Sequence, residues 1–248
     1  MIIISNLHKK FGTKEVLRGV NLKIYDGESL VILGPSGCGK SVLLKHIIGL
    51  MRPEDGQVLF DGEDITQFSQ KRIDQLRMRM GMLFQSAALF DSLTVEENVA
   101  FGLRKHTDLS STAIHHIASE KLELVGLPGT NNLMPSELSG GMRKRVGLAR
   151  AIAMDPEIIL YDEPTTGLDP IMTCQIDELH LSLKRKLGVT SIVVTHDLNS
   201  AYRIADRLAL HHGGQIVAIG TKEEIINSPN PLVQQFIRGE AKGPMTLL

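Results

Sequence analysis

The sequence is poor in cysteine and has no long apolar run. Its 248 residues include two cysteines, Cys38 and Cys174, which are too few for a disulfide framework and favour a reducing compartment. No apolar stretch reaches the roughly 18 residues that a membrane-spanning helix needs. The chain enters a strand-like pattern at Ile2, so we expect neither a signal nor a transit sequence. Any role at a membrane is therefore expected to depend on a partner.

An excess of charge of either sign is also absent. The formal net charge is −1, so no global electrostatic attraction to nucleic acid or anionic lipid is indicated, and we expect no nucleic-acid partner. No internal repeat or low-complexity tract is present. With 42% hydrophobic and 22% charged residues, the composition is that of a globular chain that can bury a core.

A phosphate-binding motif is the most informative feature that is present. An octapeptide matches GxxxxGK[ST] between an apolar run, 29–33, and a helical pattern, 42–50. Glycine backbone N–H groups and a helix N-terminus would bind the β-phosphate, Lys40 would reach the β- and γ-phosphates, and Ser41 could ligate Mg²⁺. The alternative is a glycine-rich turn with an incidental lysine. The predicted ATP-binding residues are Gly34, Pro35, Ser36, Gly37, Cys38, Gly39, Lys40 and Ser41.

Two carboxylates follow an apolar run at 158–161. Asp162 at the end of this predicted strand is suited to hold Mg²⁺ through its water shell, and Glu163 to polarise an attacking water molecule. Acid pairs at strand ends also occur for structural reasons, but together with a phosphate loop they indicate hydrolysis of a nucleoside triphosphate.

A second helix start has the features of an anion site. Ser139 is a suitable N-cap, and Gly140 and Gly141 leave the backbone N–H groups open to a ligand. The alternative is an ordinary capped helix. Because one phosphate loop already serves one nucleotide, we expect these three residues to act in trans, on the nucleotide of a second copy.

These motifs, in this order, resemble the nucleotide-binding subunit of an ATP-binding cassette (ABC) transporter. The resemblance implies a head-to-tail homodimer that binds ATP and Mg²⁺. It implies that Gln85 senses Mg²⁺ and the γ-phosphate, that His196 orients the attacking water, and that Asp169 lies in the loop linking the two sites. Phe11 would stack on adenine; otherwise it is a core or surface aromatic. His196 could otherwise be a polar residue at a sheet edge. Residues 138–142 would be the signature of this family, and they depart from it at Met142, where most members have glutamine.

The resemblance and the patterns together predict an α/β fold. We expect a P-loop NTPase core with a parallel sheet, an N-terminal antiparallel β portion and an inserted α-helical subdomain. The single ABC ATPase domain, 1–248, would comprise a catalytic core at 1–85 and 155–220, a helical signature subdomain at 86–154 and a C-terminal tail at 221–248. Helices are expected near 112–125, 139–154, 172–187 and 198–204.

The remaining basic and histidine clusters are interpreted as solvent-exposed. The basic run 143–145 is interpreted as a solvated helix face, with a lesser possibility that it attracts phosphate across the dimer. The adjacent histidine pairs, 115–116 and 211–212, have no partner pattern for a metal and are interpreted as solvated positions.

The chain also resembles the ATPases that energise Mce-type lipid transporters, such as the Mla phospholipid system. The resemblance lies in the signature 138–142, the segment 82–90 and the tail 230–244. This resemblance implies an integral membrane permease and an Mce-type or other substrate-binding protein as partners, and a peripheral position at the cytoplasmic face of the inner membrane. The alternatives are the ATPase of a polar amino acid or other small-solute importer, a soluble cassette ATPase acting on chromosomes or ribosomes, and a regulatory module without turnover.

Overall fold

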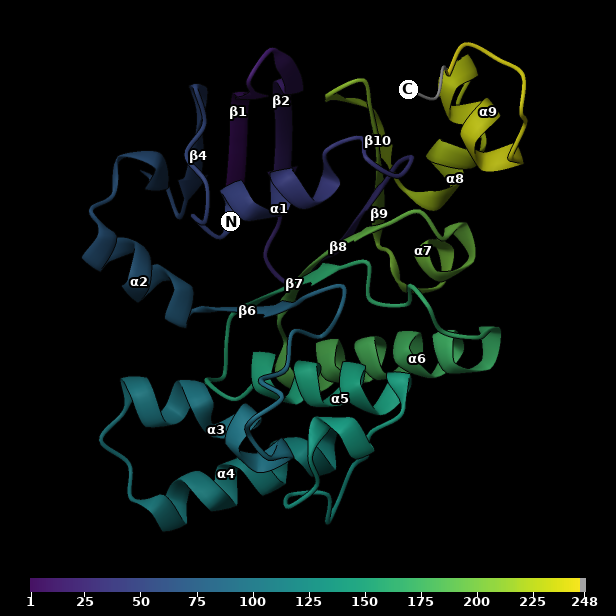
Figure 1. The fold of residues 1–248 in the computed structure, drawn as a ribbon. Helices are drawn as coiled ribbons and strands as arrows, with labels where there is room; N and C mark the ends of the chain where they lie inside the picture. The colour runs from purple at the N-terminus through teal and green to yellow at the C-terminus, as the bar shows by residue number, and fades with distance from the viewer. Residues whose placement is uncertain (246–248) are drawn as a thin grey trace. The chain divides into compact units, whose positions relative to one another are not determined.

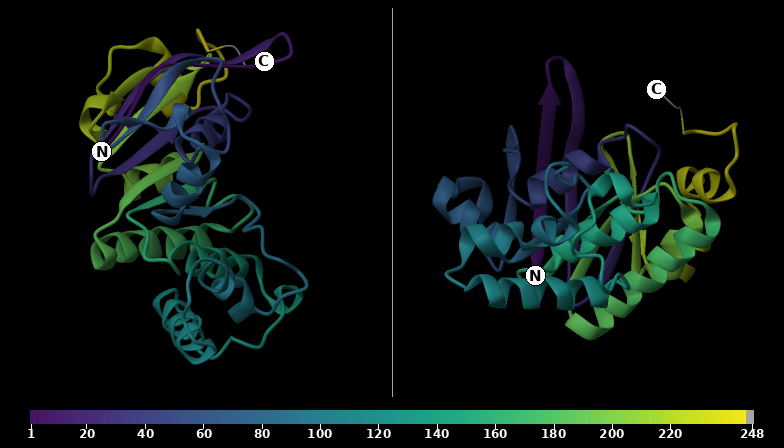
Figure 2. Two further views of the ribbon diagram at one scale, coloured as in Figure 1. Left: turned by 90° about the vertical axis from the view of Figure 1, so that its left-hand side faces the viewer. Right: turned by 60° about the horizontal axis from the view of Figure 1, so that its bottom comes forward.

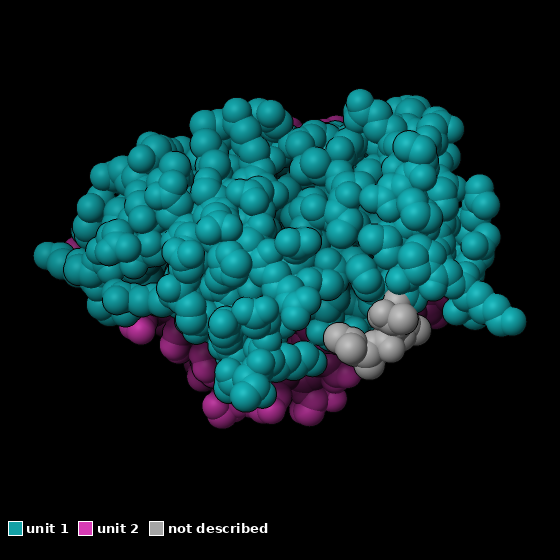
Figure 3. All heavy atoms as spheres, turned by 90° about the horizontal axis from the view of Figure 1, so that it is seen from above, with its two compact units in different colours: residues 1–77, 190–248 teal, residues 78–189 magenta. Residues whose placement is uncertain are grey.

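The computed structural model describes residues 1–245, which form two compact units coloured separately in Figure 3. Unit 1 combines Met1–Arg77 with the chain from Thr190 onward, and unit 2 is Met78–Val189. The subdomain boundaries predicted near residues 85 and 155 stay a prediction. None of the helices among the described residues is long and apolar enough to cross a membrane.

Unit 1 contains the predicted N-terminal antiparallel sheet. Its order is β2-β1-β4-β5, with Ile2 of the central strand opposite both Ile24 and Phe60. The long β1–β2 hairpin is the purple ribbon in Figures 1 and 2. Buried residues alternate with exposed ones along the C-terminal part of β2, as one-sided burial requires. The strands are β1 (Ile2–Phe11), β2 (Lys14–Ile24), β4 (Asp55–Phe60) and β5 (Glu63–Asp64).

A second sheet of unit 1 holds the strand that enters the phosphate loop. Strand β3 (Ser29–Leu33) lies parallel to β8 (Thr190–Thr195) and β9 (Arg207–His212), and β10 (Gln215–Gly220) pairs antiparallel with β9. Every residue of β3 and β8 is buried, as predicted for parallel strands covered on both faces. The remaining elements of this unit are α1 (Lys40–Ile47), η1 (Ile65–Gln67), α2 (Gln70–Met78), α7 (Leu198–Ile204), α8 (Lys222–Ile226) and α9 (Pro231–Arg238).

Unit 2 is mainly helical around a parallel strand pair, β6 (Met80–Leu83) and β7 (Ile158–Asp162). Helix α3 (Val95–His106) contacts both α4 (Ser111–Leu124) and α5 (Gly140–Ala151), and α5 also contacts β6 and α6 (Pro170–Leu187); Figure 1 labels these helices. A short η2 (Pro135–Glu137) precedes the signature. The α/β architecture predicted from the sequence, with parallel strands and an N-terminal antiparallel sheet, is therefore confirmed.

Several elements of the structure differ from what the sequence patterns predicted. Helix α3 was not predicted, although Val95, Val99 and Leu103 are buried on one helical face and Thr94 with Glu97 forms a capping box at its start. Strand β6 was also missed, because four residues rich in methionine give too short a pattern to assign.

Candidate functional site

The predicted site residues are divided between the units. Phe11, the phosphate loop and His196 belong to unit 1. Gln85, the signature, the acid pair and Asp169 belong to unit 2.

The phosphate loop connects β3 to α1, the setting that the sequence predicted. Gly37 and Gly39 have φ of 77° and 106°, a region that side chains with a Cβ disfavour. At Gly39 a Cβ would also lie 2.8 Å from Cγ1 of Val16, so both backbone conformation and space require glycine there. Helix α1 begins at Lys40, immediately after this turn, so the N–H groups of its first turn lie at the loop.

Lys40 folds back over its own loop. Its side chain is buried, and Nζ donates to the carbonyl oxygens of Gly34 at 2.8 Å and Pro35 at 3.0 Å. The ammonium group is therefore held against the phosphate loop, and Ser41 follows Lys40 on the same helix turn, half-buried. A buried cation, glycine N–H groups and a hydroxyl fit a nucleoside triphosphate.

His211 on β9 packs against the loop, and its burial corrects a prediction. It is completely buried rather than solvated, and its Nδ1 lies 3.2 Å from Sγ of Cys38. A Cβ at Gly34 would lie 2.3 Å from the carbonyl oxygen of His211, so the loop backbone runs directly on this strand. Burial, with smaller contributions from the positive charge of Lys40 and from His212, lowers the pKa of His211 to about 4. The imidazole is therefore neutral near pH 7.

His196 and Phe11 have exposed side chains. His196 follows β8 and precedes Asp197, whose Oδ1 caps α7 by accepting from the N–H groups of Asn199 and Ser200. This cap fixes the backbone immediately after His196. Phe11 ends β1 with 47% of its surface exposed, and Nζ of Lys9 lies 5.6 Å from its ring centroid. An exposed ring at this position is available for stacking.

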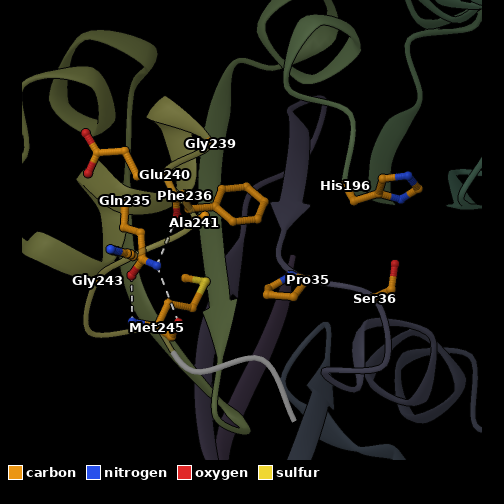
Figure 4. Close-up of a pocket in the computed structure, with 11 residues that line it drawn as sticks. Pro35, Ser36, His196, Gln235, Phe236, Gly239, Glu240, Ala241, Gly243 and Met245 are labelled. Atoms are coloured by element: carbon orange, nitrogen blue, oxygen red, sulfur yellow. Dashed lines mark hydrogen bonds between the residues drawn. The ribbon is translucent and has the colours of Figure 1, made fainter.

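His196 shares a cavity with part of the phosphate loop. Pro35, Ser36 and His196 line one side of a space of about 850 Å³, and residues from α9 and the segment after it line the other (Figure 4). The buried Gln235 holds that segment: it accepts from the Met245 N–H at 2.6 Å and donates to the carbonyl oxygens of Glu240 and Met245. Unit 1 therefore brings the predicted histidine and phosphate loop to one opening.

In unit 2 the acid pair lies at the carboxyl end of β7. Asp162 and Glu163 are 7% and 8% exposed. Glu163 has φ of 48°, an uncommon conformation for a residue other than glycine, and its Oε2 accepts from Oγ1 of Thr166 at 3.2 Å. The backbone turn thus sets the direction of this carboxylate.

The signature and Asp169 both lie at helix starts. Ser139 caps α5 by accepting from the Met142 N–H at 3.2 Å, so its hydroxyl is the predicted N-cap and the next two residues are glycines. Asp169 caps α6, accepting from the N–H groups of Ile171 and Met172 at 2.9 Å each. The hydroxyl, amide and carboxylate oxygens of Ser41, Gln85 and Asp162 are the ligand type that Mg²⁺ prefers. No cluster of three or more His, Cys, Asp or Glu suited to a metal occurs among residues 1–245.

The segment after β6 carries Gln85 and is fastened to α5 by two cations. Nζ of Lys144 donates to the carbonyl oxygen of Gln85, and the guanidinium of Arg150 donates to the carbonyl oxygens of Ala87 and Ala88 at 2.7 Å each. Both alanines have positive φ, a strained conformation that these hydrogen bonds stabilise. Lys144 is 6% exposed, so the prediction that the basic run 143–145 forms a solvated face is wrong at this residue.

A phosphate loop, a buried acid pair and a second capped helix start, on an α/β fold, define a P-loop ATPase. The ABC transporter family model matches residues 17–166, and the chain belongs to this family. It is therefore an ATPase of the ATP-binding cassette class, as the motifs predicted.

Three similar proteins are informative. The chain is 46% identical over 245 residues to the intermembrane phospholipid transport system ATP-binding protein MlaF of Haemophilus influenzae, covering 99% of this chain and 93% of that protein. It is 44% identical over 244 residues to the probable ribonucleotide transport ATP-binding protein mkl of Mycobacterium leprae, covering 98% of this chain and 70% of that protein. A dimeric ATP-binding cassette with ADP and Pi bound is 34% identical, with a TM-score of 0.82 over 89% of this chain and 98% of that one.

Proposed function

We propose that this chain is the ATP-hydrolysing subunit of a phospholipid or other lipid transporter of the Mce type. The observation that supports this most is its 46% identity to a phospholipid transport ATP-binding protein along nearly the whole of both chains. The Mla-like signature 138–142 and segment 82–90 lie within the aligned range. The partners would be a second copy, a membrane permease and an Mce-type or other substrate-binding protein, with the ATPase at the cytoplasmic face of the inner membrane.

Each predicted residue has a role in this mechanism. The phosphate loop and Lys40 bind the β- and γ-phosphates, Phe11 stacks on adenine, and Glu163 polarises the attacking water while His196 orients it. Ser41, Gln85 and Asp162 would hold Mg²⁺, which neutralises charge that develops on the phosphate oxygens. The second copy supplies Ser139, Gly140 and Gly141 to the same nucleotide, and Asp169 links the two sites. Met142 cannot donate the hydrogen bonds of a glutamine amide, so the backbone and Ser139 would provide this contact.

We propose that the region from Gln85 to Leu103 contacts the permease. Phe90 and Phe101 are 43% and 41% exposed with ring centroids 4.7 Å apart, which supports an apolar contact. The buried Asn98 fixes Phe90 by accepting from its N–H at 2.8 Å and donating to its carbonyl oxygen at 3.1 Å. Motion at Gln85 would thereby be passed to a rigid aromatic surface.

The test is to purify a tagged Glu163→Gln form with ATP from membranes of its native host and to identify the proteins and lipids that accompany it. Glu163→Gln should bind ATP, lose most of its turnover and trap the complex, because the amide cannot act as base. A tagged Lys40→Ala form is the matched control, since it should not be trapped by ATP.

We expect a multi-span permease, an Mce-domain protein and phospholipid. A permease with a soluble solute-binding protein would move the substrate to a small solute, such as the ribonucleotide in the name of the mycobacterial relative. Ribosomal or chromosomal proteins alone would refute the transport function.

A further inference from the structure

One face of α5 packs against the segment that carries Gln85. Lys144, Gly147 and Arg150 are spaced three residues apart, so they lie along the same side of the helix. Arg150 holds the carbonyl oxygens of Ala87 and Ala88. A Cβ at Gly147 would lie 2.9 Å from Cδ1 of Leu83 and 3.2 Å from Cβ of Ala87, so only glycine lets the segment lie this close. The signature helix and the Gln85 segment therefore form one packed body.

Lys144 connects this packed body to the acid pair. Besides the carbonyl oxygen of Gln85, its Nζ reaches the carbonyl oxygen of Glu163 at 3.4 Å. The negative charges of Asp162 and Glu163 favour the ammonium form, although burial is the larger effect and lowers the pKa of Lys144. A single side chain thus joins the backbone of Gln85, the backbone of Glu163 and the helix that begins at Ser139.

We propose that Lys144 is a positioning residue that keeps Gln85 and the Glu163 carboxylate in register with the signature helix. The backbone of Glu163 is held in a left-handed conformation, so its carboxylate direction depends on what anchors that peptide. Loss of the ammonium would leave the carbonyl oxygens of Gln85 and Glu163 without this donor and remove a positive charge beside two carboxylates. We expect slower ATP hydrolysis with unchanged ATP binding, because Lys144 is not part of the phosphate loop. The inference rests on the proposed roles of Gln85 and Glu163.

The test compares Lys144→Met with Arg145→Met. Arg145, the next residue of α5, also donates to a backbone carbonyl oxygen, that of Val125 at 2.8 Å, and to Oε1 of Gln175, and neither partner is Gln85 or Glu163. Nucleotide affinity, kcat, KM, melting temperature and hydrogen exchange at residues 84–90 and 163–166 are measured for the full chain. For Lys144→Met we expect kcat at least ~10-fold lower, ATP affinity within about twofold of wild type because the phosphate loop is untouched, and faster exchange in both segments.

Arg145→Met should keep its kcat whatever its melting temperature, and Lys144→Arg should recover most of the turnover because a guanidinium can donate to both carbonyl oxygens. Equal kcat for Lys144→Met and Arg145→Met would overturn the inference. If Lys144→Met does not fold, the neutral Lys144→Gln replaces it in the same assays and is judged by the same comparison. A wild-type chain that neither binds nor hydrolyses ATP would instead refute the proposed function, so the two failures are distinguishable.

Discussion

At the scale of single residues, burial changes what a side chain can do. Lys40 and Lys144 are both buried lysines whose ammonium groups rest on backbone carbonyl oxygens, one at the phosphate loop and the other between Gln85 and Glu163. The carbonyl dipoles offset part of the hydration free energy that each ammonium group loses on burial. Among the described residues, none forms a hydrogen bond with Nε2 of the buried His211. Burial without this partner disfavours the charged imidazolium, so His211 stays neutral.

The buried His211 predicts a loss of stability in acid. The unfolded chain binds a proton below its ordinary pKa near 6.5, whereas the folded chain does so only near pH 4. The contribution of His211 to the free energy of unfolding is therefore complete above pH 6.5 and is lost as the pH falls toward 4. Between pH 7.5 and 5 this loss amounts to about 2 kcal/mol. Urea unfolding at both pH values measures it.

The matched variants are His211→Met and His212→Met, since the second side chain is partly exposed. His211→Met should lose less stability on acidification than wild type, whereas His212→Met should follow wild type. An unchanged pH dependence in His211→Met would show that the native histidine takes up its proton in the ordinary range.

At the scale of elements, capping residues decide where the functional helices begin. Ser139 and Asp169 cap α5 and α6, and Thr94 with Glu97 forms a capping box for α3. In that box the Thr94 Oγ1 accepts from the Glu97 N–H at 3.2 Å, and Glu97 Oε2 accepts from the Thr94 N–H at 2.8 Å. The second hydrogen bond favours the ionised carboxylate and lowers the pKa of Glu97. Helix α3 carries Phe101, so its start affects the proposed permease surface.

Replacing Thr94 by alanine should destabilise the protein by about 1 kcal/mol, because the N–H of Glu97 loses its side-chain acceptor. Urea denaturation at pH 7 provides the measurement. Thr112→Ala, at an exposed position in the first turn of α4, is the control and should change stability by no more than about 0.5 kcal/mol. Equal effects of the two changes would argue against the capping box.

At the scale of the whole molecule, the proposed mechanism requires two copies. The N-terminus of α5 in unit 2 carries the predicted trans residues Ser139, Gly140 and Gly141. Lys40 and Ser41 of the phosphate loop belong to unit 1. The similar cassette with ADP and Pi is a dimer. ATP would join two copies because its γ-phosphate completes both half-sites, and hydrolysis would weaken that link.

We therefore expect Glu163→Gln to be a monomer without nucleotide or with ADP and a dimer with ATP and Mg²⁺. Size-exclusion chromatography with light scattering measures the mass directly. Adding Lys40→Ala to Glu163→Gln should abolish the ATP-dependent dimer, because the phosphate loop no longer holds the nucleotide. A mass that does not respond to ATP would contradict the trans roles.

The sequence by itself determined the features that depend on local chain chemistry. The glycines and Lys40 of the phosphate loop, the acid pair after a buried strand and the Ser139 cap are set by residue types at fixed spacing, and so the cassette fold and ATPase class followed. These patterns work because backbone conformation and capping act within a few residues.

Only the tertiary structure decided which polar residues are buried. Lys144 stands between two arginines and His211 beside another histidine, so each has the local pattern of a solvated residue. Lys144 is buried because the Gln85 segment, 59 residues away in the chain, packs on α5, and His211 because the phosphate loop, 173 residues from it, packs on β9. Burial depends on such distant contacts, and no local pattern in a single sequence reports them.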